Sequence, residues 1–300
     1  MINMERERDR ICRFIKEFVQ EDERVVVPVS GGMDSDVVAR LCVDALGAGR
    51  VKLFLVQQSD MEARHRENAE CLAQDLQIPL AVISLERMNE DLMAALEQGE
   101  PEDIFSVSRF LDPAKAKCSV RSSVISSYQD KGFLIAGTTN RTEWELGFFL
   151  TFGDNMAHFK PVEHLYKSQV RLLGEFIGTR KEVLEQEPSA GFWSGQTDRE
   201  DLAYWVINDG PILYPRSFSE KEEELAQRWK EKLRAETVDF CLQRFHENWD
   251  DLAVAEAAGL ETAIVTGLRH IVEKAAKYKR RQILCSLKGR YDEEGCYIED

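Results

Sequence analysis

Residues 30–35, Ser-Gly-Gly-Met-Asp-Ser, place two hydroxyl groups, two glycines and a carboxylate in one short stretch. Glycines let a ligand approach the backbone closely, and hydroxyl and backbone N–H groups donate hydrogen bonds to phosphate oxygens. A carboxylate alone would repel phosphate, so Asp34 fits this chemistry when it holds Mg²⁺ against the phosphate. The spacing differs from the GxxxxGK[ST] pattern of a Walker loop. We therefore predict another kind of phosphate-binding loop, formed by Ser30, Gly31, Gly32, Asp34 and Ser35.

The elements on either side of this stretch are those that would position such a loop. The apolar run 25–29 predicts a short buried strand, and the apolar residues between Ser35 and Leu46 fall on one helical face that ends at Gly47. In a doubly wound sheet, ligands bind beyond the carboxyl ends of the strands, where a βα turn opens a helix. This context favours a phosphate site over the alternative, an ordinary glycine turn with a helix cap.

Strand and helix patterns alternate along the first half of the chain. We expect a helix over 5–21, followed by strands at 25–29, 51–56, 79–85 and 132–138 that alternate with helices at 35–46, 62–76, 88–98 and 114–131. Such alternation predicts an α/β fold, a doubly wound parallel sheet with right-handed crossovers and helices on both faces.

The pattern changes after Gly210, where helices follow one another without strands. Ser219 and Glu222 form a capping-box pair before a charged helix. Further helices are expected over 236–248, 250–258 and 260–278. We predict two parts, a nucleotide-binding α/β domain over residues 1–210 and a helical C-terminal extension over residues 211–300 that packs on it.

Composition narrows the class of protein. Thirty-nine Lys and Arg against 54 Asp and Glu give a net charge of −15, which disfavours binding to nucleic acid. Seven cysteines show no CxxC pair and no histidine at metal-ligand spacing, which indicates reduced thiols. A charged N-terminus and the lack of a long apolar run indicate neither a signal peptide nor a membrane span. We expect a cytoplasmic protein with no nucleic-acid or membrane partner.

Several separated motifs resemble one family. SGGMDS resembles the pyrophosphate-binding loop of the N-type ATP pyrophosphatases, and the blocks 137–178 and 187–201 resemble the signature of the NAD synthetases in order and spacing. KYKRRQ at 277–282 falls where that family carries a basic segment. The resemblance implies an adenine nucleotide alpha hydrolase-like fold over residues 1–210. It also implies a homodimer and an ammonia-dependent NAD synthetase activity that uses ATP and Mg²⁺.

In that activity, the carboxylate of deamido-NAD is adenylated by ATP with release of pyrophosphate, and ammonia then gives the amide of NAD and AMP. The resemblance implies that Asp34 and Glu143 hold Mg²⁺ and that Thr138 faces the nucleotide. Lys167 and Ser189 would contact phosphate and stabilise the leaving pyrophosphate, and Asp154 would shape the place where substrate and ammonia meet. The predicted catalytic residues are therefore Lys167, Asp154 and Ser189. A nucleophilic displacement of this kind needs a cluster of positive charge on the leaving pyrophosphate.

Departures from the family pattern lie on the substrate side. Thr151 stands for a Lys, His158 for an Asp, and the pair Asp198-Arg199 for Asp-Glu, while the segment 211–265 has no clear counterpart. These changes of charge leave open a related ligase that amidates a different carboxylate.

Two further alternatives stay open. Cys118 could be the nucleophile of a sulfur-transferring ATP pyrophosphatase, although a lone helical cysteine is more often a small core residue. The chain could also be a non-catalytic nucleotide-binding protein that docks through its acidic helical extension. Because the loop begins at Ser30, we expect no N-terminal glutaminase domain, so ammonia would be free or come from a separate partner.

Overall fold

The structure is a computed structural model, and it describes residues 2–59, 61–85, 87–102, 104–106, 111–153, 155–191, 195–212, 216–280, 289–291 and 297–299. Within these residues a parallel sheet has the strand order β3-β2-β1-β4. Its strands are β1 (Arg24–Pro28), β2 (Val51–Gln57), β3 (Leu80–Ser84) and β4 (Phe133–Ile135). The predicted doubly wound α/β fold is confirmed.

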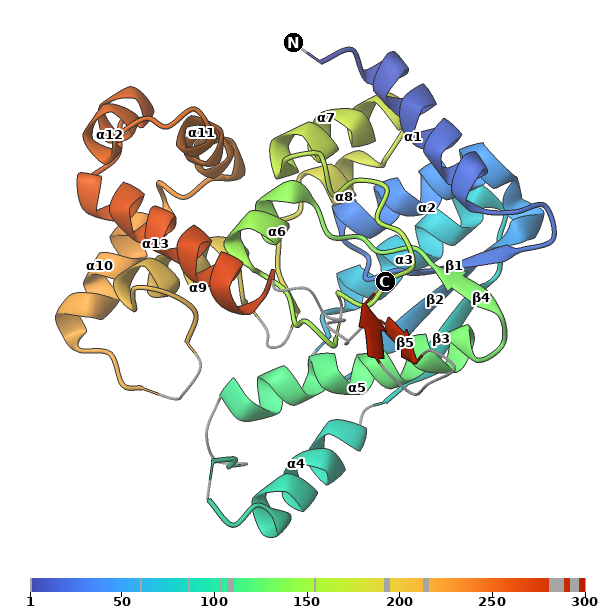
Figure 1. Cartoon of the computed structure of the whole chain (residues 1–300), viewed down its shortest axis with the longest axis horizontal. Helices are drawn as coiled ribbons and strands as arrows, with labels where there is room; N and C mark the ends of the chain where they lie inside the picture. Colours follow the sequence, from blue (N-terminus) through green and yellow to red (C-terminus); the bar gives the residue numbers. More distant parts are fainter. Residues whose placement is uncertain are drawn as a thin grey trace.

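Alternating residues of the central strand β1 pack on opposite faces of the sheet, as the two-residue period of a strand requires. Val25 and Val27 pack in a core with the helices α1 (Met4–Phe18), α2 (Met33–Leu46), α3 (Ala63–Leu76) and α7 (Lys167–Ile177). Val26 packs in a second core with α4 (Met88–Gly99) and α5 (Leu111–Gln129). Figure 1 shows the two helical layers on either side of the strands.

Strand β4 is shorter than the sequence predicts. The run 132–138 is apolar or small throughout, but the strand itself covers only Phe133–Ile135. Beyond it, Ala136 forms an isolated bridge with Phe159, and the Gly137 N–H donates to the Phe159 carbonyl at 2.8 Å. The Ala136 N–H still donates to the Val26 carbonyl of β1 at 3.1 Å, and the chain then leaves the sheet and enters α6 (Arg141–Leu146).

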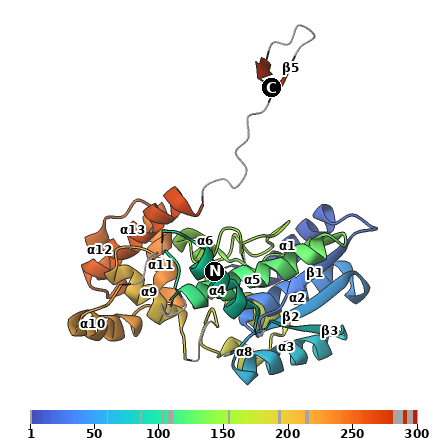
Figure 2. The same ribbon diagram turned by 90° about the horizontal axis from the view of Figure 1, so that it is seen from below.

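The later helices form a third core of their own. This part contains α9 (Asp198–Ile207), α10 (Glu220–Lys230), α11 (Ala235–His246), α12 (Asp251–Ala258) and α13 (Thr262–Tyr278). They bury Trp229, Leu242 and Leu268 together with Leu146 of α6. In Figure 1 and Figure 2 these helices lie beside the sheet, next to α6. The boundary at residue 210 stays a prediction, because α9 already belongs to this core.

Shorter elements complete the chain: η1 (Ala48–Arg50), α8 (Lys181–Leu184) and an antiparallel pair of strands, β5 (Gly289–Tyr291) and β6 (Tyr297–Glu299). Among the helices of the described residues, none has the length and apolar character that crossing a membrane would need.

Candidate active site

The predicted phosphate-binding loop joins β1 to α2 and is closed by its own hydroxyl groups. The Ser35 hydroxyl accepts a hydrogen bond from the Ser30 N–H at 3.1 Å and donates to the Gly32 carbonyl at 3.0 Å. The Gly32 N–H donates to the Ser30 hydroxyl at 3.3 Å. These bonds hold the loop open at the N-terminus of α2, the geometry that suits an anion.

Gly31 differs from the other residues of the loop because it packs against α3 and does not face the adjoining cavity. Its φ of +75° lies in the left-handed region, and a Cβ built there would lie 1.9 Å from the His65 carbonyl oxygen. Asn68 also donates to the Gly31 carbonyl at 3.1 Å. Gly31 is buried against α3 and is absent from the wall of the adjoining cavity, which Ser30, Gly32, Asp34 and Ser35 do line. Glycine is needed here for the close approach of two backbones.

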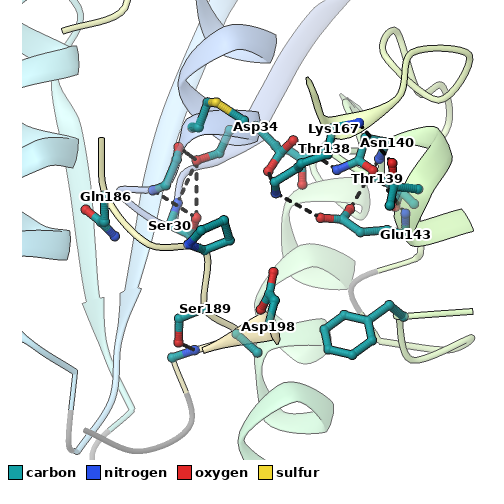
Figure 3. A pocket seen from close by; sticks show the side chains of 18 of the residues that line it. Ser30, Asp34, Thr138, Thr139, Asn140, Glu143, Lys167, Gln186, Ser189 and Asp198 are labelled. Carbon is teal, nitrogen blue, oxygen red and sulfur yellow. Dashed lines mark hydrogen bonds and ion pairs between the residues drawn. The ribbon is translucent and has the colours of Figure 1, made fainter. Parts of the chain in front are cut away.

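Beside the loop, an ammonium group lies between two carboxylates (Figure 3). Lys167 Nζ donates to Asp34 Oδ2 in a short contact and to Glu143 Oε1 at 3.3 Å. Asn140 Nδ2 donates to the other oxygen of Asp34 at 3.0 Å. Residues from three distant parts of the chain therefore meet at one point, and the structure brings together Asp34, Glu143 and Lys167 as the sequence predicts.

The starts of two helices fix this cluster. Asn140 caps α6: its side chain accepts from the Glu143 N–H at 3.0 Å, and Glu143 Oε2 accepts from the Asn140 N–H at 3.2 Å. This capping box turns Glu143 Oε1 towards Lys167, the first residue of α7. The local sequence Asn-x-x-Glu thus sets both the helix start and the direction of the carboxylate.

The cluster is largely withdrawn from water, since the side chains of Lys167 and Asp34 are 12% and 16% exposed. Burial lowers the pKa of Lys167, but the carboxylates of Asp34, Glu143 and Asp198 outweigh it and raise the pKa above its usual range. Burial also raises the pKa of Glu143, and Asp34 adds to the rise while Lys167 opposes it. Lys167 is therefore cationic, and a further cation would stabilise the charged forms of the two carboxylates.

A cavity of about 730 Å³ opens in front of the loop and the cluster. Thr138 and Ser189, to which the resemblance assigns contacts with the nucleotide, both line it, and the Ser189 hydroxyl accepts from the Gly191 N–H at 3.0 Å. Asp198, at the start of α9, lines the same cavity, and burial raises its pKa to about 6 although Lys167 opposes the shift. Asp154, the remaining predicted catalytic residue, lies outside the described residues.

Of the single-residue departures from the family pattern, only the pair 198–199 reaches this cavity. Arg199 lines it and forms an ion pair with Glu187 at 2.6 Å. Thr151 does not line it. His158 lines another pocket, and its Nδ1 accepts from the Ile135 N–H at 2.9 Å, so this histidine closes the end of β4. Of these substitutions, the one that changes the charge beside the cavity is therefore Arg199.

Cys118 is placed as a core residue. Its side chain is buried, and its Sγ lies 3.3 Å from the position of a Cβ built on Gly153. It does not line the cavity that holds Lys167. A nucleophile must reach its substrate, so this position disfavours sulfur transfer through Cys118.

Asp34 and Glu143 are the residues that could hold a metal ion. Their oxygens flank one ammonium group, and carboxylate oxygen is the ligand type that Mg²⁺ prefers, so the donor set fits this ion. In the part of the chain that the structure describes, no group of three or more His, Cys, Asp or Glu residues is arranged around a metal site. A Mg²⁺ ion would therefore take its remaining ligands from water and phosphate.

Sequence reasoning missed some of the residues that build this site. Asn140 lies inside the block that resembles the family, and its Asn-x-x-Glu spacing is a capping signal that could have singled it out. Residues 231 and 233–236 also line the cavity, although they follow α10 in the helical extension. Nothing in the local sequence of that segment indicates contact with a nucleotide site.

Comparison with known proteins identifies the same family as the sequence motifs. A family model described as NAD synthase matches residues 7–248. The NH(3)-dependent NAD(+) synthetase of Methanocaldococcus jannaschii is 33% identical over 225 residues, which cover 73% of this chain and 85% of that protein. The solved structure of NMN synthetase from Francisella tularensis is 26% identical with a TM-score of 0.61, and covers 77% of this chain and 94% of that chain. NH3-dependent NAD synthetase from Campylobacter jejuni has a TM-score of 0.68 over 95% of this chain and 100% of that chain; at 20% identity it shows the shared fold.

Proposed function

The chain belongs to the NAD synthase family, as the sequence motifs predict, and from this premise we propose that it is an ATP-dependent ligase that forms NAD from deamido-NAD and ammonia. The observation that carries the proposal is the cluster of Asp34, Glu143 and Lys167 at the mouth of the Ser-Gly-Gly-x-Asp-Ser loop. A loop that binds phosphate, a buried ammonium group and two carboxylates are what adenylation of a carboxylate requires.

In the first step, an oxygen of the substrate carboxylate attacks the α-phosphorus of ATP, and the bond to the β-phosphate breaks. Pyrophosphate leaves with the electron pair. The loop residues Ser30, Gly32 and Ser35 would bind the β- and γ-phosphates, and Lys167 Nζ would stabilise the charge that grows on the leaving group. Thr138 and Ser189 would orient the nucleotide from two other walls of the cavity.

Mg²⁺, bound by Asp34 and Glu143, would supply further positive charge to the phosphates. The protein side of this arrangement already places one ammonium group against two carboxylates, which both accept hydrogen bonds from Lys167. When phosphate oxygens enter, the ammonium group of Lys167 can turn to them, which would leave the carboxylates of Asp34 and Glu143 free to hold the ion.

In the second step, ammonia attacks the carbonyl carbon of the acyl-adenylate. AMP leaves with the electron pair, the nitrogen loses a proton, and the amide results. We propose that ammonia enters from solution or from a separate partner.

A second acceptor is supported by one specific comparison. The solved NMN synthetase is 26% identical to this chain, and its name implies that it forms the amide of a mononucleotide. Arg199, the departure that borders the cavity, adds a cation on that side of the site. Nicotinate mononucleotide is therefore the second candidate substrate, with the same chemistry at the carboxylate.

The test measures release of pyrophosphate and AMP by the purified protein with Mg²⁺, ATP and ammonium. Deamido-NAD, nicotinate mononucleotide or no acceptor is added, and the amide product is quantified. Release that depends on deamido-NAD, with NAD in equal amount, supports the proposal. Release with the mononucleotide alone supports the second candidate. Nucleotide binding without release under any of these conditions contradicts both.

We further propose a homodimer in the cytoplasm. Large apolar side chains remain about 40–50% exposed on the adjacent helices α1 and α7, namely Phe14, Phe18, Leu172 and Phe176. Exposed large apolar side chains on neighbouring helices are typical of a protein interface. Free thiols at Cys12, Cys42, Cys71, Cys118 and Cys241 agree with a reducing compartment.

A further inference from the structure

Asp239, in the helical extension, reaches the helices that carry the catalytic cluster. Its carboxylate is 2% exposed. Asp239 Oδ1 accepts a hydrogen bond from the Thr142 hydroxyl on α6, and Oδ2 accepts from the Ser168 N–H on α7 at 2.8 Å. A buried carboxylate is costly unless both oxygens have partners, and here each partner comes from a different helix.

The same bonds continue directly to Lys167. Its backbone N–H donates to the Thr142 hydroxyl at 2.9 Å, so Thr142 stands between Lys167 and Asp239. Ser168, the next residue, is bound to Asp239 itself. Asp239 therefore holds two successive N–H groups in the first turn of α7, that of Ser168 directly and that of Lys167 through the Thr142 hydroxyl. Such N–H groups otherwise lack partners within their own helix.

The position of the Lys167 ammonium group depends on this first turn. A side chain of four methylene groups can place its charge in many places, and only one of them lies between Asp34 and Glu143. Thr142 and Glu143 are neighbours on α6, so the bond to Asp239 also fixes the helix that carries the second carboxylate. Asp239 therefore helps to fix both α6, which carries Glu143, and α7, which carries Lys167.

Asp239 lies in the segment 211–265, for which the sequence motifs show no clear counterpart, although the family model extends as far as residue 248. The helix that carries it, α11, packs on α6 and α7, and the turn before it lines the cavity. We propose that Asp239 is a positioning residue, through which the helical extension fixes Lys167 and Glu143 in the geometry that adenylation needs. This inference rests on the proposed function for its catalytic consequence, but not for its structural one.

The test compares Asp239→Asn with a matched control in the same extension. An amide offers one acceptor oxygen, so either Thr142 or Ser168 loses its bond in Asp239→Asn. The control is Asp251→Asn, because Asp251 also joins two helices, accepting from Thr266 and Arg269 at 2.6 Å each, but lies away from the cavity. Both variants weaken the extension, and only the first acts on Lys167.

Two readouts are measured in both variants. For Asp239→Asn we expect kcat for acceptor-dependent pyrophosphate release to fall about 10-fold to 100-fold, with the KM for ATP changed less than about twofold. We also expect faster acylation of Lys167 by an amine-reactive reagent, followed by mass spectrometry, because the ammonium group leaves its carboxylates. Asp251→Asn should lower the melting temperature and change neither kcat nor the labelling of Lys167.

Equal kcat and equal labelling in the two variants would overturn the inference. Should Asp239→Asn fail to fold, Thr142→Val removes the relay and must give the same two changes, while unchanged labelling in that variant counts against the proposal. If the wild type releases no pyrophosphate with any acceptor, the proposed function fails, and the labelling comparison still decides the role of Asp239.

Discussion

Lys167 has its charge compensated by two carboxylates before any ligand is present. Because the group is buried, removing it leaves Asp34 and Glu143 facing each other without a cation, and removing either carboxylate leaves Lys167 with one carboxylate partner instead of two. The three residues act as one unit, so the effects of replacing them should not add.

Replacement of the lysine tests this unit. In Lys167→Met the side chain keeps its length and loses its charge, so we expect the rate of pyrophosphate release to fall about 10²-fold to 10³-fold. Lys181→Met, on an exposed lysine, serves as the control and should leave the rate unchanged. A loss of less than about threefold in Lys167→Met would contradict the proposed role.

A buried carboxyl at the start of α9 predicts a dependence of stability on pH. Burial raises the pKa of Asp201 to about 7, although a hydrogen bond from Gln196 opposes the shift. In the unfolded chain its pKa is about 3.9, so the folded state loses stability as the pH rises from about 4 to about 7. Asp201→Asn has no such charge to bury. Its free energy of unfolding should therefore exceed that of the wild type by about 1–3 kcal/mol at pH 8 and differ little from it at pH 4.

Asp251→Asn should show the opposite pH dependence when the free energy of unfolding of both variants and the wild type is measured by urea titration between pH 3 and pH 8, roughly the range that the two pKa shifts span. Burial raises the pKa of Asp251, but hydrogen bonds from Thr266 and Arg269 outweigh it and hold the pKa below its usual value. Its stabilisation is therefore present above a pH of about 4 and lost as the pH falls further. Differences from the wild type that do not vary with pH in either variant would show that the charges of these carboxyls are not the cause.

The turn from β1 into α2 is the element on which the site depends most directly. Its glycines are not equivalent, because Gly31 needs a positive φ and a close approach to His65, whereas Gly32 has a φ of −98° that any residue adopts. A side chain at Gly31 would force the loop away from α3, and the hydroxyl network of Ser30 and Ser35 would open with it.

We expect Gly31→Ala to lose at least about 2–3 kcal/mol of unfolding free energy, and ATP binding with it. Gly32→Ala should lose less than about 1 kcal/mol, since its new Cβ would meet only the Ser30 hydroxyl, at 3.3 Å. Thermal unfolding and calorimetric titration with ATP measure both quantities. Equal losses in the two variants would mean that the contact with His65 does not set the loop.

These elements also show what the sequence could predict. The phosphate-binding loop and the first three strands were predictable, because local period and turn chemistry specify them. The fourth strand was predicted too long, since its small residues suit a strand but bridge to Phe159 instead. The role of Asp239 was out of reach, because its partners Thr142 and Ser168 lie far away in the sequence. Contacts of that kind depend on how helices pack, which no local pattern specifies.

At the scale of the molecule, the cavity draws its walls from the sheet, from α6 and α7, and from the helical extension. The extension has its own core, yet that core includes Leu146 of α6. The α/β part and the extension are therefore joined by apolar packing as well as by Asp239. The side chains of Phe14 and Phe18 on α1 and of Leu172 and Phe176 on α7 nevertheless remain 41–47% exposed.

That face gives a prediction about assembly. Leu172→Glu places a charge among exposed apolar side chains of α7, and we expect it to turn a dimer into a monomer in light scattering after gel filtration. Leu252→Glu, on a still more exposed leucine of α12, is the control and should stay dimeric. A wild type that is monomeric at all concentrations would contradict the homodimer.

During synthesis of the chain, the loop at residues 30–35 emerges early and Asp239 emerges much later. The two are separated by about 200 residues, which at about 5–20 residues per second takes a ribosome about 10–40 s. The parallel sheet can pair within that interval because β4 ends at Ile135, but Lys167 still lacks the side chain that anchors it. A nascent chain therefore carries a folded sheet before it carries the side chain that anchors Lys167.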